Sequence, residues 1–254
     1  MATTFRSGNP VLSAKTFDVP VGGETMTIGG TVNKTALLLV LVLLTANFTW
    51  SMFDASSTQS MQESLPRVQG WMIGGFLGGF VLAMVTIFKK TWAMFTAPAY
   101  ALFQGLALGG ISAVFEAQFP GIVIQAVGLT FGTLGCLLLA YRSGLIRATE
   151  NFKLGVVAAT GAIAVIYLVN IVMGFFGGSI GFIHDSGPLG IGFSLIVVTI
   201  AALNLVLDFD FIENGAERGA PKYLEWYGAF GLTVTLIWLY LEILRLLSKL
   251  RGRN

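Results

Sequence analysis

The sequence predicts an all-α membrane protein, a bundle of seven transmembrane helices, and three observations support this fold class. Hydrophobic residues make up 55% of the 254 residues, and charged residues make up only 11%. A soluble domain carries about 25% charged residues, so this chain cannot cover a water-facing surface with polar groups. The third observation is a series of seven apolar runs along the chain.

Each apolar run is close to the length of about 20 residues that a helix needs to cross the hydrocarbon core of a bilayer. The predicted spans are residues 35–53, 70–88, 97–119, 121–141, 154–176, 189–212 and 227–247. Each is uncharged through its middle, and charged residues or Gly and Pro bound several of them. Backbone groups in lipid must be satisfied within the segment, so we expect helices. The sequence lacks the short alternating segments of a transmembrane barrel.

The remaining segments are short. We expect residues 1–34 to form a polar N-terminal tail, residues 35–247 the membrane domain, and residues 248–254 a basic C-terminal tail. The N-terminal residues do not have the basic start and immediate apolar stretch of a secretory signal. Cys136 and His184 are the only residues of their types, which excludes a disulfide framework and a multi-histidine metal site. The low charge content also argues against nucleic-acid binding.

Glycines are frequent within the predicted spans, at Gly74, Gly75, Gly78 and Gly79 of the second and at Gly128, Gly132 and Gly135 of the fourth. Small residues four positions apart let two helices approach closely. We therefore expect these glycines to serve helix packing rather than to line a pore.

The distribution of Lys and Arg predicts a cytoplasmic N-terminus, because cytoplasmic loops are enriched in these residues. With that orientation the outside loops hold only Arg67. A seventh crossing, however, places a basic tail outside, with Arg245, Lys249, Arg251 and Arg253. Either the last segment re-enters without crossing or the tail breaks the rule. We favour the full crossing, because the segment is long enough.

Ionisable residues within spans are costly, so they are the first candidates for function. Asp208 and Asp210 lie near the inner end of the sixth span, and two positions apart on a helix they face different ways. Asn204 lies one turn before Asp208 on the same face and is a candidate for a polar pathway. An apolar setting favours the neutral form of a carboxyl group. Asp208 is therefore predicted to act as a proton or cation switch, and Asp210 is a second candidate for an ion- or pH-sensing role. The alternative is a helix end with solvated acids.

Glu242 lies near the far end of the seventh span, where Thr235 and Trp238 share its helical face. Arg245 follows Glu242 by three residues, so an intrahelical ion pair is the simpler interpretation. An ion- or pH-sensing role for Glu242 is the alternative to that structural pair.

The weaker candidates for a polar pathway are Glu116, late in the third span, and Gln104, earlier in it. Buried amides between helices more often bond across them than bind a substrate. Glu213, Glu217 and Glu225 fall between the sixth and seventh spans, and we expect them to be solvated loop residues.

Four stretches of the chain together point to a family. They are residues 207–212 with 216–219, residues 104–116, residues 6–12 and residues 225–242. In these stretches the chain resembles the Bax inhibitor-1 family, and the first and last segments resemble its bacterial branch. The resemblance covers nearly the whole chain.

The resemblance implies seven helices with the last one surrounded by the other six. It also implies a pH-sensitive calcium leak, protection against cell death and, in bacteria, an association with a membrane protease. The leak is attributed to two aspartates, in spans six and seven, that share a proton. Asp208 matches the first, whereas Thr235 stands where the second would be. The family's basic residue in span two has no match, since Arg67 precedes the predicted span, and Gln104 replaces a usual acid.

We therefore expect a pH-sensitive calcium or cation leak channel, or an ion-homeostasis regulator, gated by an intramembrane carboxylate. We expect the lipid bilayer and a membrane protein as partners, and a bacterial plasma membrane as the location, with the N-terminus in the cytoplasm. We expect no enzyme activity and no cofactor, with Ca²⁺ as the transported ion. The alternative is a non-conducting regulatory partner of a membrane protease or stress-response complex. The sequence does not indicate an oligomeric state.

Two other membrane classes are disfavoured. A retinal photoreceptor needs a lysine deep in a helix, whereas every lysine here lies in a tail, a loop or at the end of a predicted span. An intramembrane hydrolase needs a nucleophile and a base paired within the bilayer, and the predicted spans contain no histidine. A two-aspartate protease would need aspartates on two helices, whereas Asp208 and Asp210 lie on one.

Overall fold

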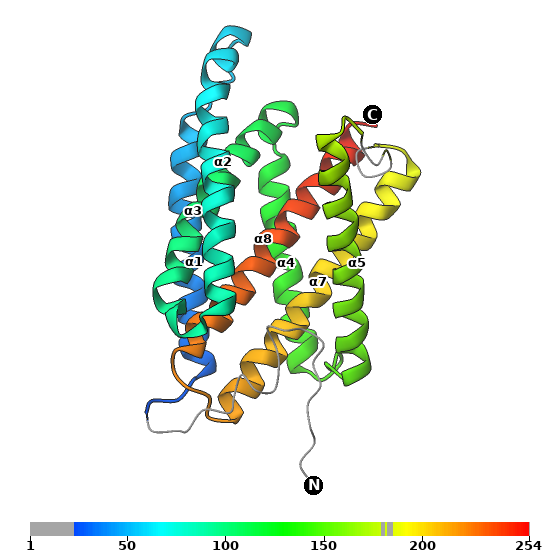
Figure 1. Ribbon diagram of the computed structural model, residues 1–254. Helices are drawn as coiled ribbons and strands as arrows, with labels where there is room; N and C mark the ends of the chain where they lie inside the picture. Colours follow the sequence, from blue (N-terminus) through cyan, green and yellow to red (C-terminus); the bar gives the residue numbers. More distant parts are fainter. Residues whose placement is uncertain (1–22, 179–180, 182–184, 254) are drawn as a thin grey trace. The chain divides into compact units, whose positions relative to one another are not determined.

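Seven long helices make up most of the computed structural model, which describes residues 23–178, 181 and 185–253 (Figure 1). They are α1 (Ile28–Ser51), α2 (Thr58–Phe88), α3 (Ala93–Gln118), α4 (Ile122–Arg142), α5 (Glu150–Phe175), α7 (Pro188–Glu217) and α8 (Leu224–Arg251), with a short 3₁₀ helix η3 (Lys90–Trp92) before α3. All seven are long and apolar enough to cross a membrane. The predicted all-α, seven-helix class is confirmed, and the described residues contain no strand beyond an isolated bridge between Thr25 and Pro221.

Several helices extend well beyond the predicted spans, because polar capping residues rather than hydropathy set their ends. Thr27 caps α1 by accepting a hydrogen bond from the Gly30 N–H, and Ser57 caps α2 by accepting one from the Ser60 N–H. As a result α1 begins seven residues and α2 twelve residues before the predicted starts. α7 continues to Glu217 and α8 begins at Leu224, so the segment between them is much shorter than predicted.

The chain divides into two compact units. Residues 19–123 and 212–234 form one, the α1–α3 unit, which includes the start of α8. Residues 124–211 and 235–254 form most of the other, the α4–α7 unit, which includes the second half of α8.

Close helix contacts in the α1–α3 unit depend on glycine. α3 packs against both α1 and α2. A Cβ atom at Gly105 or Gly109 of α3 would clash with backbone atoms of α1, and one at Gly75 of α2 would lie 2.5 Å from the Phe103 carbonyl oxygen of α3. Any larger residue would push these helices apart. The packing role predicted for the second span is confirmed at Gly75, and Gly78 and Gly79 also meet α3 side chains.

The same prediction is wrong for the fourth span. Among the described residues, no atom of another helix comes within 4 Å of a Cβ atom built at Gly128, Gly132 or Gly135 of α4. A Cβ atom built at Gly74 of α2 likewise has no other helix within 4 Å in the described ranges. A spacing of small residues shows that a helix has a narrow face, but it does not show which face a neighbour occupies.

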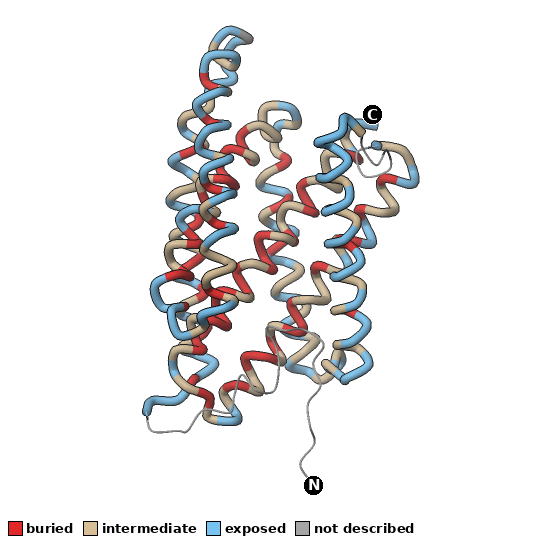
Figure 2. The backbone as a smooth tube through the Cα atoms, viewed as in Figure 1, coloured by how far each residue is buried: buried red, intermediate tan, exposed pale blue. Residues whose placement is uncertain are grey.

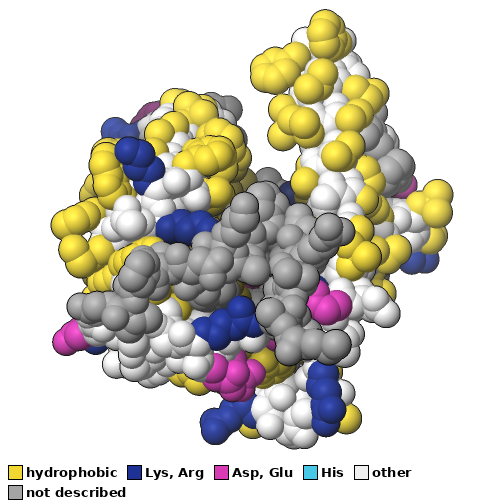
Figure 3. Space-filling view, turned by 60° about the horizontal axis from the view of Figure 1, so that its bottom comes forward, with side chains coloured by type: hydrophobic (Ala, Val, Ile, Leu, Met, Phe, Trp, Pro, Cys, Tyr) yellow, Lys and Arg dark blue, Asp and Glu magenta, His cyan; other side chains and the backbone are white. Residues whose placement is uncertain are grey.

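Burial differs strongly between the helices (Figure 2). In the most apolar window of α8, 56% of the residues are buried, against 50% in α3 and between 11% and 33% in the other five. Large apolar side chains such as Phe76, Phe80 and Leu168 are more than half exposed. Figure 3 shows such side chains covering the sides of helices, with Lys and Arg side chains at the end that faces the viewer. Helices of this length and exposure belong in lipid, and the chain is an integral membrane protein.

Candidate functional site

Asp208 lies deeper in its helix than the sequence predicts. It sits in α7 nine residues before the last residue, Glu217, which is about 13 Å from the helix end at 1.5 Å per residue. The prediction placed it near the end of a span that stopped at residue 212. Its neighbours Leu205, Val206, Leu207 and Phe209 are all buried, so the alternative of a helix end with solvated acids does not fit.

The two oxygens of the Asp208 carboxyl group have different surroundings. The Thr235 side chain of α8 hydrogen-bonds to this group. The Oδ2 atom is buried and has no hydrogen-bond partner within the described part of the chain. Leaving a buried polar atom unpaired is costly, and more so when it carries charge. A proton or a cation at Oδ2 would remove that cost.

Thr235 therefore meets Asp208 within the α4–α7 unit. The resemblance placed Thr235 where a second aspartate would stand, and the structure puts its side chain, which is 8% exposed, against the first. The pair thus combines one carboxyl group with one hydroxyl group. The hydroxyl stabilises one oxygen of Asp208 and leaves the other for a further ligand.

Asn204 has a structural contact rather than one with Asp208. Its Nδ2 atom donates to the Thr160 hydroxyl of α5 and to the Ile200 carbonyl, both at 2.8 Å. These bonds tie α7 to α5 one turn before Asp208. These hydrogen bonds do not support the polar-pathway role predicted for Asn204.

Asp210 faces a cation. Its Oδ2 atom lies 2.7 Å from the Lys153 ammonium at the start of α5, and Lys153 also lies 3.5 Å from Glu150. The different directions predicted for Asp208 and Asp210 are confirmed by these different partners. Asp210 is neutralised by its ion pair, which makes it a poorer candidate for a switch than Asp208.

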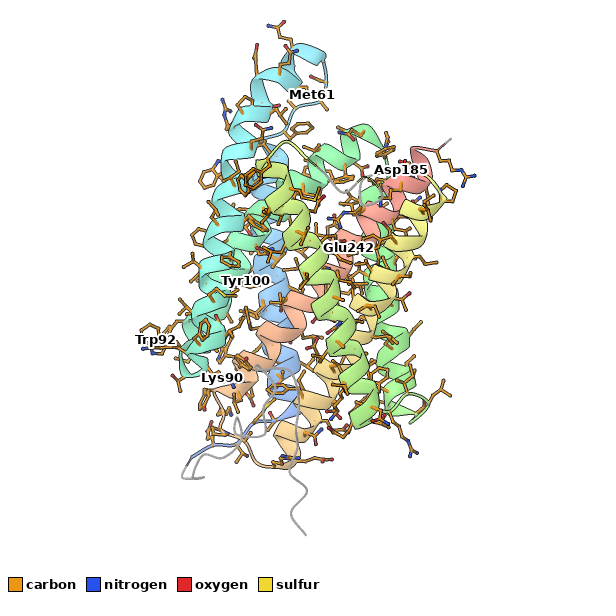
Figure 4. All side chains as sticks on the ribbon, turned by 45° about the vertical axis from the view of Figure 1, so that its right-hand side comes forward. Met61, Lys90, Trp92, Tyr100, Asp185 and Glu242 are labelled. Atoms are coloured by element: carbon orange, nitrogen blue, oxygen red, sulfur yellow. The ribbon has the colours of Figure 1, made fainter. Side chains whose placement is uncertain are left out.

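Glu242 belongs to a partly buried cluster that joins α5 and α8 (Figure 4). Its carboxylate is 2% exposed and accepts hydrogen bonds from Arg245 at 2.9 Å, from the Tyr167 hydroxyl at 2.9 Å and from the Trp238 indole at 3.3 Å. Arg245 also donates to the Tyr167 hydroxyl at 2.6 Å. The predicted ion pair with Arg245 is confirmed, and the added partners favour its structural interpretation.

The basic end of α8 is less of a tail than predicted. Lys249 is 5% exposed and donates to the Ser194 hydroxyl at 2.9 Å and to the Gly190 carbonyl at 3.0 Å, both in α7. Lys249, which falls in the predicted C-terminal tail, thus packs against α7 as part of α8. Arg251 donates to Gln125 of α4 at 2.9 Å. Because α8 is a continuous helix of 28 residues, it suits a full crossing better than a re-entrant turn.

Glu116 and Gln104 have structural partners in the α1–α3 unit. The Glu116 carboxylate accepts hydrogen bonds from the backbone N–H groups of Gly121 and Val123, where α4 begins. This is the favourable position for an acid at a helix N-terminus. The Gln104 side chain lies against Gly79 of α2. The hydrogen bonds of Glu116 account for its carboxylate without a pathway.

Glu225 has an environment very different from the one predicted from the sequence. It was predicted to be solvated, but it lies in the first turn of α8 with a side chain that is 0% exposed. It accepts hydrogen bonds from the Thr27 N–H and hydroxyl, both at 2.9 Å, and forms an ion pair with Lys34. One feature of the sequence could have indicated that an acid from elsewhere in the chain lies at the start of α1. α1 has no acidic residue in its first turn, so its N-terminus lacks the local acid that commonly stabilises a helix start.

A short backbone pairing lies beside Glu225. The Met26 N–H donates to the Ala220 carbonyl at 2.7 Å, and the Lys222 N–H donates to the Glu24 carbonyl at 3.0 Å. The Lys222 and Glu24 side chains form an exposed ion pair at 2.9 Å, and this carboxylate raises the pKa of Lys222. Residues 24–27 are therefore held against the α7–α8 connection.

Other predicted features fall elsewhere. Arg67 precedes the predicted span but lies inside α2, where it is exposed, because this helix begins twelve residues before the span. His184 and residues 6–12 lie outside the described residues. Within the described residues, no group of three or more His, Cys, Asp or Glu side chains is arranged to hold a metal ion.

Comparison with known proteins adds one finding. The family model described as Bax inhibitor 1 like matches residues 9–252, nearly the whole chain. No curated protein and no solved structure matches the chain. The matched region includes all seven long helices and both residues of the Asp208–Thr235 pair.

Proposed function

The chain belongs to the Bax inhibitor 1 like family, and we propose that it is a pH-sensitive cation leak pathway gated by Asp208, with Ca²⁺ as the first ion to test. The observation that carries this proposal is the buried Oδ2 atom of Asp208, which has no hydrogen-bond partner among the residues that the structure describes. An ionisable group inside an apolar helix is a functional candidate by default. The proposal assigns the chain no catalytic reaction and no cofactor.

The proposed gate follows from the two protonation states of Asp208. The protonated group is neutral and compatible with its apolar neighbours. The ionised group places a negative charge at an oxygen that the surrounding apolar side chains cannot solvate, which favours the entry of a cation or of water. We therefore expect flux to rise as the pH increases and Asp208 loses its proton. Nearby charged groups in the same unit, Asp210 and Lys153, neutralise each other.

The proposed location is a bacterial plasma membrane, and the proposed orientation places the N-terminus on its cytoplasmic side. Support comes from the basic residues near the start of α1 and the start of α8. Lys34 and Lys90 contact the neighbouring residues Trp226 and Tyr227, and Lys222 lies just before α8. Such a concentration of lysine at one end of the helices is typical of a cytoplasmic face.

The test is cation flux into proteoliposomes between about pH 5 and pH 8, the range in which a buried carboxyl group titrates. Asp208→Asn keeps the shape of the side chain and removes its charge. We expect the variant to lose the pH dependence. Asp54→Asn is the matched control, since Asp54 is an exposed loop acid that bonds locally to Ser56. Wild-type flux at every pH in Asp208→Asn would contradict the proposal.

A second candidate function is a non-conducting regulatory partner of another membrane protein, and the length of α2 favours it. α2 has 31 residues, or about 46 Å, whereas the hydrocarbon core is about 30 Å thick. Its first twelve residues, 58–69, are largely polar and include exposed Glu63 and Arg67. This function predicts no flux by folded wild-type protein, together with a partner whose crosslinks to residues 58–69 are lost in Glu63→Lys/Arg67→Glu.

A further inference from the structure

The corner between α2 and α3, residues 86–96, is firmly held. α2 ends at Phe88, η3 follows, and α3 begins at Ala93. Beneath the turn, the buried Thr86 hydroxyl donates to the Thr96 hydroxyl at 2.7 Å. The Trp92 N–H donates to the Lys89 carbonyl at 2.9 Å. The side chains on this corner are therefore presented by a fixed backbone.

Two adjacent lysines on the corner contact aromatic rings. The Lys89 ammonium lies 4.7 Å from the centre of the Trp92 ring, and the Lys90 ammonium lies 5.3 Å from the centre of the Tyr227 ring in α8. Contacts of this kind orient a cation, but they leave its charge in place.

Other lysines of the described chain differ from Lys89 in their partners. Lys34, Lys153 and Lys222 each form an ion pair with a carboxylate. The ion pairs found among the described residues do not include Lys89. The corner therefore carries two adjacent positive charges. Among the described residues, no ion pair with a carboxylate offsets the charge of Lys89.

The aromatic side chains of the corner indicate its depth in the membrane. Phe88 is 81% exposed, Trp92 is 53% exposed and Phe95 is 70% exposed, at the junction of two membrane-spanning helices. Figure 4 shows Lys90 and Trp92 at the opposite end of α2 from Met61. Exposed aromatic residues beside lysines are typical of the boundary between hydrocarbon and headgroups. At this level the abundant negative group is the lipid phosphate.

We propose that the α2–α3 corner binds the phosphate of an anionic phospholipid. Lys89 and Lys90 contact the phosphate, and Phe88, Trp92 and Phe95 lie against the upper part of the acyl chains. Basic residues next to transmembrane helices recognise anionic headgroups in this way. This site is separate from the leak pathway proposed at Asp208, and its test does not depend on flux.

The test is lipid binding by the purified full chain in detergent, titrated with phosphatidylglycerol or phosphatidylcholine and read by native mass spectrometry. Each lysine near a lipid surface contributes about 1 kcal/mol, or roughly a fivefold change in affinity. Lys89→Gln/Lys90→Gln should therefore bind phosphatidylglycerol about 25-fold more weakly. Binding of phosphatidylcholine should not change. Arg67→Gln, which removes an exposed charge elsewhere on α2, should bind like the wild type.

Three further measurements decide the interpretation. Lys89→Arg/Lys90→Arg keeps both charges and should bind phosphatidylglycerol within about twofold of the wild type. If the glutamine variant does not fold, the wild type alone still tests the proposal, since added salt must weaken its preference for phosphatidylglycerol. Equal affinity in wild type and folded glutamine variant would overturn the proposal. Displacement of the lipid by inorganic phosphate at comparable concentration would also overturn it, because the site would then be one for free phosphate.

Discussion

Two carboxyl groups, the buried Glu225 and the half-buried Asp208, have opposite hydrogen-bonding environments. Glu225 is fully buried but has a cation and two hydrogen-bond donors as partners, namely Lys34 and the Thr27 N–H and hydroxyl. Asp208 has a hydrogen bond from Thr235 and one buried oxygen that has no partner in the described ranges of the chain. A satisfied buried acid holds helices together, whereas an unsatisfied one is ready to take a proton or a cation. The difference separates a structural acid from a functional one.

The largest effect is expected from Glu225→Ala. Removing one partner of a buried ion pair leaves the other without compensation, which costs about 3–5 kcal/mol. Thermal unfolding in detergent should therefore show a strong loss of stability. Glu24→Ala, at an exposed acid three residues before Thr27, is the control and should unfold like the wild type. Equal effects of the two substitutions would remove the structural role of Glu225.

Asp208→Leu should not lower stability, in contrast to Glu225→Ala. Replacing a poorly satisfied buried polar group with an apolar one of similar size is neutral or stabilising, by up to about 3 kcal/mol. The same unfolding assay measures it. A loss of stability comparable with that of Glu225→Ala would show that Asp208 is also a structural acid.

Thr235→Val should have a smaller effect. It keeps the shape of the side chain and removes one hydrogen bond to Asp208, which is expected to lower stability by about 1 kcal/mol. Flux should remain dependent on pH, because the carboxyl group that titrates is still present. The variant is compared with Thr199→Val, whose hydroxyl bonds only to its own helix at Leu195. A larger loss of stability in Thr199→Val would show that the hydrogen bond to Asp208 contributes no more than a bond within one helix.

Lys222→Ala should have the smallest effect, because its ion pair with Glu24 is exposed and such pairs contribute little. Glu24 raises the pKa of Lys222. The favourable contribution is therefore complete at neutral pH and is lost as the pH rises through the raised pKa, above about pH 10. Unfolding temperatures of wild type and variant should be close at neutral pH and converge fully in alkaline solution. A difference that grows with pH would contradict this assignment.

The sequence was sufficient for the fold because lipid imposes long apolar helices, and all seven are visible as hydropathy runs. It was less informative at helix ends, where Thr27 and Ser57 extend α1 and α2 beyond their apolar parts. Asp208 could be found because a charge in an apolar run is conspicuous. Thr235 was singled out by its shared helical face with Glu242 and by the family resemblance.

Glu225 and Lys249 could not be placed from the sequence because their partners are distant along the chain. Glu225 binds Thr27, 198 residues away, and Lys249 binds Ser194, 55 residues away. A charged residue beside an apolar run is solvated in most proteins, and only tertiary packing makes these two exceptions. The glycines of α4 illustrate the converse, since their spacing suggested a contact that the described residues do not make.

The central claim is that the unpartnered oxygen of Asp208 controls flux. The most direct measurement is the pH profile of cation flux through wild type and Asp208→Asn in matched proteoliposomes, with the folded state of each verified by its unfolding temperature. The account predicts that wild-type flux rises with pH and that the variant's flux is independent of pH. Identical pH-dependent profiles in two equally stable proteins would contradict it.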